Sequence, residues 1–246
     1  MKIVINSAFN VLNSFITNIP DLFEKEGELV YTARNQLKYF SVNGFEVIVK
    51  RYKKPHLINR IAYTFFRPSK AKRAYEYAFK LLEIDVESPT PIAYIEQKNC
   101  NLITYSYFVS LYLNDYMDIR EFMDGNQTDE TLLKQLSLYI ADLHNKGILH
   151  LDMSPGNILY KKDGNNFHFT LIDINRMQFL QSISKNIRFK SFKRLSENEN
   201  VLTAIAKLYA AASNLNEIES ILKINQYSSK FFSSRKRSKS RINQKL

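Results

Sequence analysis

The 246-residue sequence predicts an α+β protein with two lobes, a small β-rich first lobe and a mainly helical second lobe. Two observations predict this division. Strand-like patterns broken by turn residues fill much of the first half, whereas helical patterns with capping residues dominate from about residue 128 onward. We expect the first lobe over residues 1–108, the second over 109–229, and a basic, disordered tail over 230–246.

The first lobe is expected to be a sheet with one helix. Its strands are predicted at 37–42, 45–50, 92–96 and 102–108. Asn43-Gly44 separates the first two strands and is the strongest short-range signal for a two-residue hairpin. Residues 53–68 are predicted to be irregular and basic. A helix over 70–83 follows, because Pro68-Ser69 is a good helix start and the segment is rich in helix formers.

The second lobe is expected to contain two long helices and a hairpin. Thr128-Asp-Glu is predicted to cap a helix that runs to about Asn145 and ends at Gly147. Ser196-Glu-Asn-Glu199 matches a capping box and predicts a second helix to about Leu222. Between these helices, the segments 158–160 and 167–172 are predicted to be the two strands of a hairpin.

The pattern richest in reactive side chains begins immediately before this hairpin. It reads His150-Leu-Asp152-Met-Ser-Pro-Gly-Asn157, and Asp173 follows sixteen residues after Asn157, at the end of an apolar run. The hairpin should return Asp173 to the neighbourhood of Asn157. Kinase-like folds build a phosphoryl-transfer site from these groups: one carboxylate orients the attacking hydroxyl, and an amide and a second carboxylate bind magnesium. We therefore predict a protein-kinase-like fold in which Asp152 is catalytic and Asn157 and Asp173 bind Mg²⁺.

Lys50, at the end of an apolar strand, is the expected ligand of the ATP phosphates. In kinase-like folds, a strand lysine contacts the α- and β-phosphates and is held by a glutamate of the next helix. Glu76 is the expected partner, because it is the only acid among the ten Lys and Arg of residues 50–80, and Glu83 is the second choice. Ile48 lies on the same strand face as Lys50 and is expected to cover the adenine ring.

Each of these residues also has an ordinary structural explanation. A lysine at a strand edge, an aspartate in a loop and an asparagine in a turn are common, so the argument depends on their joint spacing. His150 is expected to brace the loop by packing and hydrogen bonding rather than to act in catalysis. The other histidines have no partners in the sequence and are expected to be ordinary surface or interface residues: His56, His144 and His168.

The composition indicates a folded protein from a reducing compartment. The apolar share is 45%, and 17 Phe and 15 Tyr argue against disorder. The single cysteine, Cys100, excludes an internal disulfide and a multi-cysteine metal site. No apolar run approaches the roughly 18 residues that a membrane-spanning helix needs. The N-terminus is a poor signal peptide, so we expect a cytoplasmic protein.

The formal charge of +11 is unevenly distributed. Residues 230–246 carry seven Lys and Arg and no acid, and residues 50–80 form a second basic segment. Residues 115–130 are acidic by contrast, with six Asp and Glu against one Arg. The basic segments should attract an anionic partner, and nucleic acid, anionic lipid and a phosphorylated substrate all qualify. No nucleic-acid recognition motif is present, so a nucleic-acid partner is not expected.

Four segments of the chain resemble the lipopolysaccharide kinase family, over roughly residues 25–200. They are Val49-Lys-Arg-Tyr-Lys-Lys-Pro, Pro68-Ser-Lys-Ala-Lys-Arg-Ala-Tyr-Glu, the segment from His150 to Leu159, and Leu171-Ile-Asp-Ile-Asn-Arg-Met. The resemblance implies an ATP- and Mg²⁺-dependent kinase that phosphorylates an inner-core sugar, Kdo or heptose, of a lipid A precursor. It further implies a lipid A–core glycolipid or another anionic small molecule as acceptor, and peripheral contact with the anionic cytoplasmic face of the inner membrane.

The same resemblance assigns roles to individual residues. Lys50 and Glu76 would hold the phosphates, Asp152 would be catalytic, and Asn157 and Asp173 would bind magnesium. Other positions differ from protein kinases. Residues 27–36 contain one glycine, so there is no glycine-rich phosphate loop, and Arg34 and Asn35 are candidates to replace it.

Two more departures lie close to the predicted site. Ser154 stands where many kinases have Lys or His, and Ile174-Asn175 replaces the Phe-Gly that usually follows the metal-binding Asp. Asn tolerates left-handed backbone better than most residues, so Asn175 is expected to preserve that turn. The segment 177–195 is short and no Ala-Pro-Glu follows it, which removes the peptide-docking platform of protein kinases. A small or glycolipid acceptor is favoured; a small-molecule or protein kinase and a nucleotide-binding pseudokinase scaffold remain the alternatives.

Overall fold

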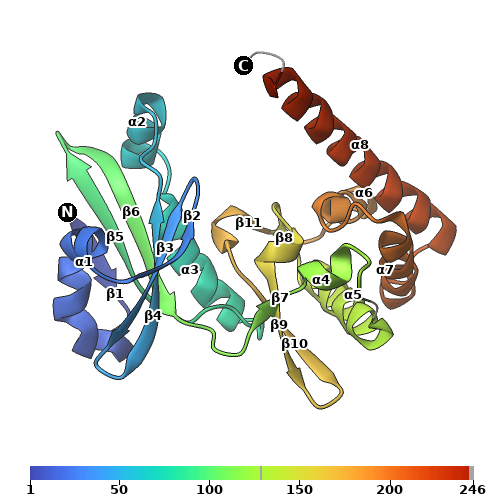
Figure 1. Ribbon diagram of the computed structural model, residues 1–246, viewed down its shortest axis with the longest axis horizontal. Coiled ribbons are helices and arrows are strands. Elements are labelled where there is room, and N and C mark those ends of the chain that lie inside the picture. Colours follow the sequence, from blue (N-terminus) through green and yellow to red (C-terminus); the bar gives the residue numbers. More distant parts are fainter. Residues whose placement is uncertain (128, 244–246) are drawn as a thin grey trace. The chain divides into compact units, whose positions relative to one another are not determined.

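The computed structural model describes residues 1–127 and 129–243, apart from the side chains of 239 and 241–243. The chain divides into two compact units, Met1–Asn114 and Asp115–Leu246. This boundary lies six residues later than the one predicted from the sequence, because β6 and the loop after it belong to the first unit. Figure 1 shows the strands of the first unit and the mainly helical second unit.

The first unit is built on a six-stranded antiparallel sheet with the strand order β1-β5-β6-β4-β3-β2. The strands are β1 (Lys2–Ile5), β2 (Glu28–Thr32), β3 (Gln36–Val42), β4 (Phe45–Tyr52), β5 (Pro91–Asn99) and β6 (Leu102–Leu111). Asn43 and Gly44 join β3 and β4 with φ of 49° and 79°, as a two-residue hairpin with positive φ at both positions requires. The predicted hairpin is therefore confirmed.

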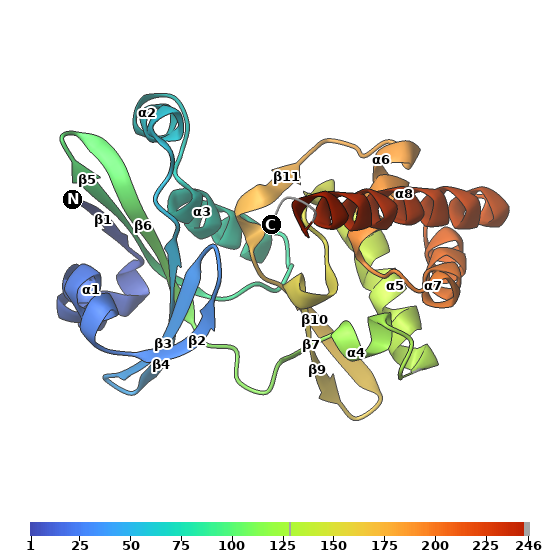
Figure 2. The same cartoon turned by 45° about the horizontal axis from the view of Figure 1, so that its top comes forward.

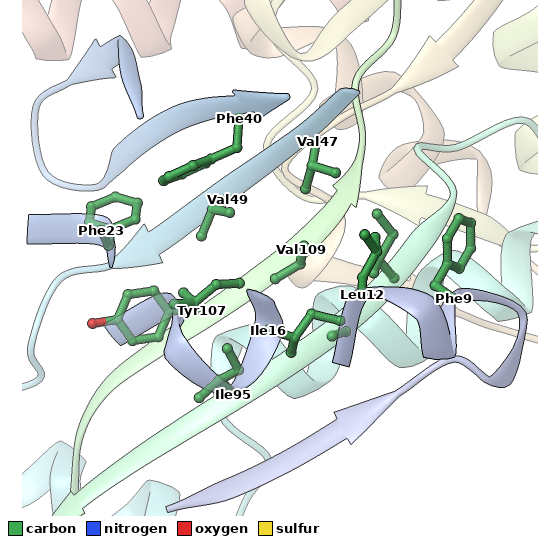
Figure 3. Close-up of a cluster of buried hydrophobic side chains, with 13 residues drawn as sticks. Phe9, Leu12, Ile16, Phe23, Phe40, Val47, Val49, Ile95, Tyr107 and Val109 are labelled. Atoms are coloured by element: carbon green, nitrogen blue, oxygen red, sulfur yellow. The ribbon is translucent and has the colours of Figure 1, made fainter. Parts of the chain in front are cut away.

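One face of this sheet is covered by an N-terminal segment that the sequence analysis did not identify. It consists of η1 (Ser7–Leu12) and α1 (Asn13–Lys25). Ile16, Ile19 and Phe23 recur at helical spacing and are buried against the sheet. Figure 3 shows Ile16 and Phe23 in one apolar cluster with Val47 and Val49 of β4. The core therefore fixes which face of β4 points inward.

Two helices follow β4. The predicted helix is α3 (Lys70–Leu82), and the side chain of Ser69 caps it by accepting a hydrogen bond from the Lys72 N–H at 3.1 Å. The preceding segment differs from its prediction, because α2 (Leu57–Phe65) is helical where irregular chain was expected. Arg60 and Thr64 attach α2 to β6 by hydrogen bonds, a tertiary contact that the local sequence does not reveal.

The second unit contains helices and two small sheets. Its helices are α4 (Arg120–Met123), α5 (Glu130–Asn145), α6 (Lys185–Ser191), α7 (Glu199–Ala212) and α8 (Glu217–Asn243), with the short turns η2 (Pro155–Asn157), η3 (Ile174–Arg176) and η4 (Phe192–Arg194). One sheet has the order β10-β9-β7, and the other pairs β11 with β8. These strands are β7 (Met117–Asp118), β8 (Ile148–His150), β9 (Ile158–Asp163), β10 (Asn166–Leu171) and β11 (Met177–Phe179).

The helix predicted from Thr128 begins slightly later than expected. Asp129 caps α5 by accepting a hydrogen bond from the Leu132 N–H at 2.9 Å, and residue 128 lies outside the described residues. His144 near the end of α5 corrects a second prediction, since it is buried rather than at the surface. The Tyr209 hydroxyl lies 2.8 Å from its Nδ1, and Ser191 Oγ lies 3.3 Å from its Nε2. α7 and α6 therefore supply partners that are distant in the sequence.

The C-terminal helices differ from the prediction in three ways. The expected capping box at Ser196 is wrong, because Asn198 is the N-cap of α7, which begins at Glu199, and the Ser196 hydroxyl donates to the Met123 carbonyl. The expected helix to about Leu222 is two helices, broken after Ala212 where Asn214 adopts φ of 51°. The expected disordered tail from residue 230 continues α8 as helix through Asn243. Residues 217–243 contain no Gly or Pro, and Ser228 of α8 is buried and donates to the Ser196 carbonyl at 2.7 Å. Among the described residues, no helix is both long and apolar enough to cross a bilayer.

Candidate active site

The second unit brings Asp152, Asn157 and Asp173 together through backbone hydrogen bonds. β9 and β10 pair so that Leu171 lies opposite Ile158. The Ile172 N–H then donates to the Asn157 carbonyl at 3.0 Å, and the Asn157 amide donates to the Asp152 carbonyl at 2.8 Å. The hairpin therefore returns Asp173 to the loop that carries Asp152 and Asn157, as its length predicts.

His150 joins the two strands that carry these carboxylates. Its Nε2 lies 3.1 Å from the Ile172 carbonyl oxygen, and its Nδ1 accepts a hydrogen bond from the Asp152 N–H at 3.1 Å. An N–H at Nε2 satisfies both contacts with a neutral ring. Burial of the side chain lowers the pKa of His150 and so favours that neutral form. The predicted role of His150 as a hydrogen-bonding brace is confirmed.

Asp173 adopts the left-handed conformation that was expected of Asn175. Its φ is 56°, and Ile174–Arg176 follows as the short turn η3. The side chain of Asn175 is buried and donates from Nδ2 to Asp173 Oδ1 at 2.6 Å. The asparagine therefore orients the carboxylate instead of providing the left-handed residue of the turn.

The oxygens near Asp173 fit a magnesium ion bound jointly with phosphates. Mg²⁺ in such sites takes one or two protein carboxylates and completes its octahedral shell with phosphate and water oxygens. Within the described residues, no group of three or more His, Cys, Asp and Glu could hold a metal without a nucleotide. Asn175 Oδ1 is buried and has no hydrogen-bond partner among the described residues. Asp173 and Asn157 offer a carboxylate and an amide oxygen, the hard oxygen ligands that Mg²⁺ prefers.

Two arginines contact Asp152, and the sequence analysis did not identify them. Arg176 Nη1 lies 3.2 Å from Asp152 Oδ2, and Arg194 Nη1 pairs with Asp152 Oδ1. The Arg194 guanidinium also lies 4.9 Å from the ring centroid of Phe231 in α8. Arg176 lies three residues after Asp173, so its place in the sequence could have indicated a residue of the site. Arg194 lies 42 residues from Asp152, so no local pattern indicates it.

A third cation, Lys193, lies among the arginines that pair with Asp152. Lys193 precedes Arg194, and its pKa is lowered by partial burial and by the charges of Lys190, Arg194 and Arg176. Asp152 acts in the opposite direction and only offsets part of this effect. Arg176, Lys193 and Arg194 therefore form a group of cations beside Asp152.

In the first unit, Lys50 and Ile48 lie on the same face of β4, as predicted. Val47 and Val49 are fully buried against the α1 side of the sheet, so Ile48 and Lys50 project from the other face. Both side chains are half-buried. The Lys50 Nζ lies 5.4 Å from the ring centroid of Tyr52 on the same strand.

The two candidate partners of Lys50 lie on α3 or at its end. Glu76 forms an ion pair with Lys72, with Nζ and Oε1 3.6 Å apart, and its side chain is 43% exposed. Glu83 is exposed at the C-cap of α3. Pairing of Glu76 with Lys50 stays a prediction, as do the roles assigned to Ile48 and Lys50.

The loop between β2 and β3 has a structure that needs no glycine. Asn35 Oδ1 accepts a hydrogen bond from the Lys53 N–H at 3.2 Å, and the Asn35 carbonyl accepts from the Ala33 N–H at 3.1 Å. Asn35 therefore links this loop to the chain that leaves β4. The substitution of Arg34 or Asn35 for a glycine-rich loop also stays a prediction.

Comparisons with solved structures and curated proteins agree with this geometry. A solved structure described as WaaP in complex with acyl carrier protein matches with a TM-score of 0.64 at 16% identity, covering 94% of this chain and all of that chain. This likeness confirms the predicted α+β, protein-kinase-like fold. The 3-phosphoinositide-dependent protein kinase 1 of Homo sapiens and that of Mus musculus are each 29% identical in an alignment of 140 residues that covers 48% of this chain. The chain spans about a quarter of the length of these curated relatives (24%).

A family model covers most of the sequence. The model described as the lipopolysaccharide kinase (Kdo/WaaP) family matches residues 24–212. This range includes Lys50 and the catalytic-loop pattern from His150 to Asp173. The chain belongs to the lipopolysaccharide kinase (Kdo/WaaP) family, a family of phosphotransferases with a kinase-like fold.

Proposed function

We propose that this protein uses ATP and Mg²⁺ to phosphorylate a sugar hydroxyl, on Kdo or heptose, of a lipopolysaccharide inner-core glycolipid. Family membership supports a kinase of this class. The observation that carries the proposal is the hydrogen-bonded link from Asp152 through Asn157 to Ile172, which ties the backbone of the proposed catalytic residue to the residue before Asp173. Phosphoryl transfer depends mainly on alignment and charge neutralisation. This link supports alignment, and Mg²⁺ held at Asp173 would supply the neutralising charge.

Each residue has a defined task in this proposal. Asp152 accepts a hydrogen bond from the acceptor hydroxyl and aligns its oxygen for attack. Asn157 and Asp173 hold Mg²⁺, with Asn175 keeping the Asp173 carboxylate in place. Bound magnesium neutralises charge on the phosphates as the phosphoryl group is transferred. Lys50 binds the α- and β-phosphates, and Ile48 covers the adenine ring.

We further propose that the protein works at the anionic cytoplasmic face of the inner membrane, where a lipid-linked acceptor is available. The basic segment 50–80 and the basic end of α8 support attraction to such a surface. The alternatives are a kinase for a soluble small molecule and a protein kinase. The protein-kinase alternative is favoured by the 29% identity to 3-phosphoinositide-dependent protein kinase 1.

Transfer of labelled phosphate from ATP to different acceptors distinguishes these functions. The full chain is incubated with ATP, Mg²⁺ and a panel of acceptors: lipid A–core glycolipids that end in Kdo or heptose, aminoglycosides, and proteins. Labelling of the glycolipid, with loss of transfer in Asp152→Asn, is the expected result. Labelling of a protein or an aminoglycoside alone would assign the alternative. Nucleotide binding without transfer to any acceptor would favour a pseudokinase scaffold.

A further inference from the structure

Both carboxylate oxygens of Asp152 are occupied by cations of the same unit. Arg176 contacts Oδ2 at 3.2 Å and Arg194 contacts Oδ1, while the Asp152 side chain is only 15% exposed. Each carboxylate oxygen can accept a second hydrogen bond, but the two guanidinium groups cover much of the approach to this mostly buried side chain. A substrate hydroxyl therefore competes with the arginines for access to Asp152.

Arg194 is held close to Asp152 by more than the carboxylate. Phe231 of α8 lies under the Arg194 guanidinium, and the Phe231 ring is also 6.0 Å from Lys193 Nζ. Arg194 Nε is buried and has no hydrogen-bond partner among the described residues. Burial and the charges of Lys190, Arg194 and Arg176 lower the pKa of Lys193, so this lysine lies among the same cations. This arrangement leaves guanidinium donors and an ammonium group for a second anion.

We propose that Arg176, Lys193 and Arg194 bind an anionic group of the acceptor, a carboxylate or a phosphate, and that this anion draws the arginines away from Asp152. The inference rests on the proposed function and specifies its acceptor: the phosphorylated hydroxyl lies close to an anionic group. Arginine suits this task because its planar fork binds carboxylate and phosphate in two-point geometry. Without an anionic acceptor, Asp152 stays paired and ATP hydrolysis by water is suppressed.

The kinetic test uses Arg194→Gln and a matched control, Lys207→Gln, which removes an exposed cation paired with Glu217. In Arg194→Gln, the KM for an anionic acceptor should rise at least about tenfold, the value expected when one charged hydrogen bond is lost. The KM for ATP should not change, and acceptor-independent ATP hydrolysis should increase. Lys207→Gln should behave as wild type. An unchanged acceptor KM would overturn the proposal. So would a loss in kcat alone, because it would place Arg194 on the transferred phosphoryl group.

A binding experiment tests the site without turnover. Calorimetric titration of the full chain with methyl phosphate should show binding that weakens about tenfold in Arg194→Gln and persists in Lys207→Gln, whereas methyl glucoside should not bind. Lys50→Met should leave this affinity unchanged. If methyl phosphate binding is lost in Lys50→Met but not in Arg194→Gln, the anion binds where the nucleotide phosphates are proposed to bind. That result would overturn the proposal. If no acceptor is phosphorylated yet methyl phosphate binding depends on Arg194, the proposed function fails and the anion site stands.

The orientation of α2 in the first unit supports a second inference. α2 is attached to the sheet by its polar side: Arg60 Nε donates to the Ile103 carbonyl at 2.9 Å, and the Ile103 N–H donates to Thr64 Oγ1 at 3.1 Å. Figures 1 and 2 show α2 beside β6. None of the α2 side chains is buried. The helix is therefore oriented opposite to a normal surface helix, which buries its apolar side.

The apolar face of α2 is exposed. Leu57, Ile61 and Phe65 recur every four residues and are 61%, 41% and 67% exposed, and the neighbouring Ile58 is 82% exposed. Phe66, directly after the helix, is 82% exposed. An apolar stripe of this kind is unfavourable in water unless another apolar phase covers it.

The charges beside this face indicate what covers it. Lys53, Lys54 and Arg67 flank α2 and are exposed, and Glu76 is the only acid in residues 50–80. A short helix with an apolar face and flanking cations is typical of segments that lie in the plane of an anionic membrane. We infer that α2 docks on an anionic lipid surface, with its apolar face among the acyl chains and the lysines at the head groups.

Vesicle binding of the full chain tests this inference. Ile58→Ser with Phe65→Ser should weaken binding to phosphatidylglycerol-containing vesicles at least about a hundredfold, about tenfold for each apolar side chain kept from burial. The matched control is Ile218→Ser with Leu222→Ser on α8, which removes side chains that are 70% and 64% exposed and should leave binding unchanged. Lys53→Gln with Lys54→Gln should reduce binding mainly at low salt.

Two results would overturn the membrane assignment. One is vesicle binding that does not respond to Ile58→Ser with Phe65→Ser. The other is a concentration-dependent dimer in sedimentation, or a stable complex with an acyl carrier protein, that these substitutions abolish while vesicle binding persists. In that case another protein surface, not lipid, covers α2.

Discussion

His150 and Ile172 are joined by a hydrogen bond between the His150 Nε2 and the Ile172 carbonyl, 3.1 Å apart. His150 lies two residues before Asp152, and Ile172 directly precedes Asp173. The same ring accepts the Asp152 N–H at its other nitrogen. One buried imidazole therefore sets the relative position of the two carboxylates in the candidate active site.

Removal of this link should reduce transfer more than it reduces folding. His150→Phe keeps most of the volume but leaves the Asp152 N–H and the Ile172 carbonyl without their partner, so the free energy of unfolding should fall by about 1–3 kcal/mol. The kcat should fall at least about tenfold because the carboxylates lose their alignment. His168→Phe, at an exposed strand position, is the control. Unchanged kcat in the folded His150→Phe protein would contradict the positioning role.

Replacing Asp152 and replacing Asp173 should affect transfer and nucleotide binding differently. Asp152→Asn keeps the side-chain shape and removes the charge that orients the hydroxyl, so transfer should be lost while nucleotide affinity stays nearly intact. Asp173→Ala removes a metal ligand and should weaken Mg-ATP binding itself. Nucleotide titrations with and without Mg²⁺ separate the two effects. Equal Mg-ATP affinity in Asp173→Ala and wild type would refute the metal assignment.

A double-mutant cycle tests whether Glu76 acts through Lys50. Lys50→Met should lower kcat/KM strongly, and Glu76→Gln should lower it less. The double variant should be no worse than Lys50→Met alone. Lys72→Met is a necessary control, because Lys72 is the ion-pair partner of Glu76 within α3. If the effects of the two substitutions on kcat/KM add fully, Glu76 is not the partner of Lys50. Glu83→Gln is then tested in the same cycle.

Stability should decrease as the pH falls through the acidic range because of His144. Burial lowers the pKa of His144 to about 3 from its usual 6.5. Below pH 6.5 the unfolded chain binds a proton that the folded protein excludes, so stability is lost as the pH falls from 6.5 toward 3, by about 1.4 kcal/mol per pH unit. Urea unfolding at pH 7, 6 and 5 measures this slope. His144→Gln should reduce the slope, and the exposed His168→Gln should not; equal slopes in all three proteins would exclude His144 as the cause.

Two glycines with positive φ should tolerate alanine to different degrees. Gly147 has φ of 75°, and a Cβ there would lie 1.8 Å from the Leu180 carbonyl oxygen. Gly164 has φ of 58° and nothing within 4 Å of its Cβ position. Gly164→Ala should cost about 1 kcal/mol of unfolding free energy from backbone strain alone. Gly147→Ala should cost at least about 2 kcal/mol more, because the β8–β11 pair must shift; similar values for the two variants in urea unfolding would contradict this.

The sequence could predict those features that depend on residues close together in the chain. Asn43-Gly44 predicts its hairpin because both residues tolerate positive φ. The length of the 158–172 hairpin predicts that Asp173 returns to Asn157, because antiparallel pairing fixes the register. Ser69 predicts the start of α3 because its hydroxyl satisfies a free N–H of the first turn.

Other features depended on contacts that are distant in the sequence. α2 is helical although residues 53–68 lack a clear signal, and it is held by Arg60 and Thr64 against β6. α8 extends through the basic tail, and one side of its first half is anchored by the buried Ser220, Ile224 and Ser228. His144 is buried because Tyr209 and Ser191 satisfy both of its ring nitrogens. Local composition carries no information about any of these partners.

The sequence by itself therefore determined the fold class, the catalytic-loop pattern and the resemblance to the lipopolysaccharide kinase family, because these are encoded in spacing and residue type along the chain. Only the tertiary structure decided that Arg176 and Arg194 pair with Asp152, and that α2 presents its apolar side to solvent. The physical reason is the same in both cases. Which groups face each other across 42 residues, and which face of a helix is buried, depends on how elements pack, and packing is fixed by the whole chain.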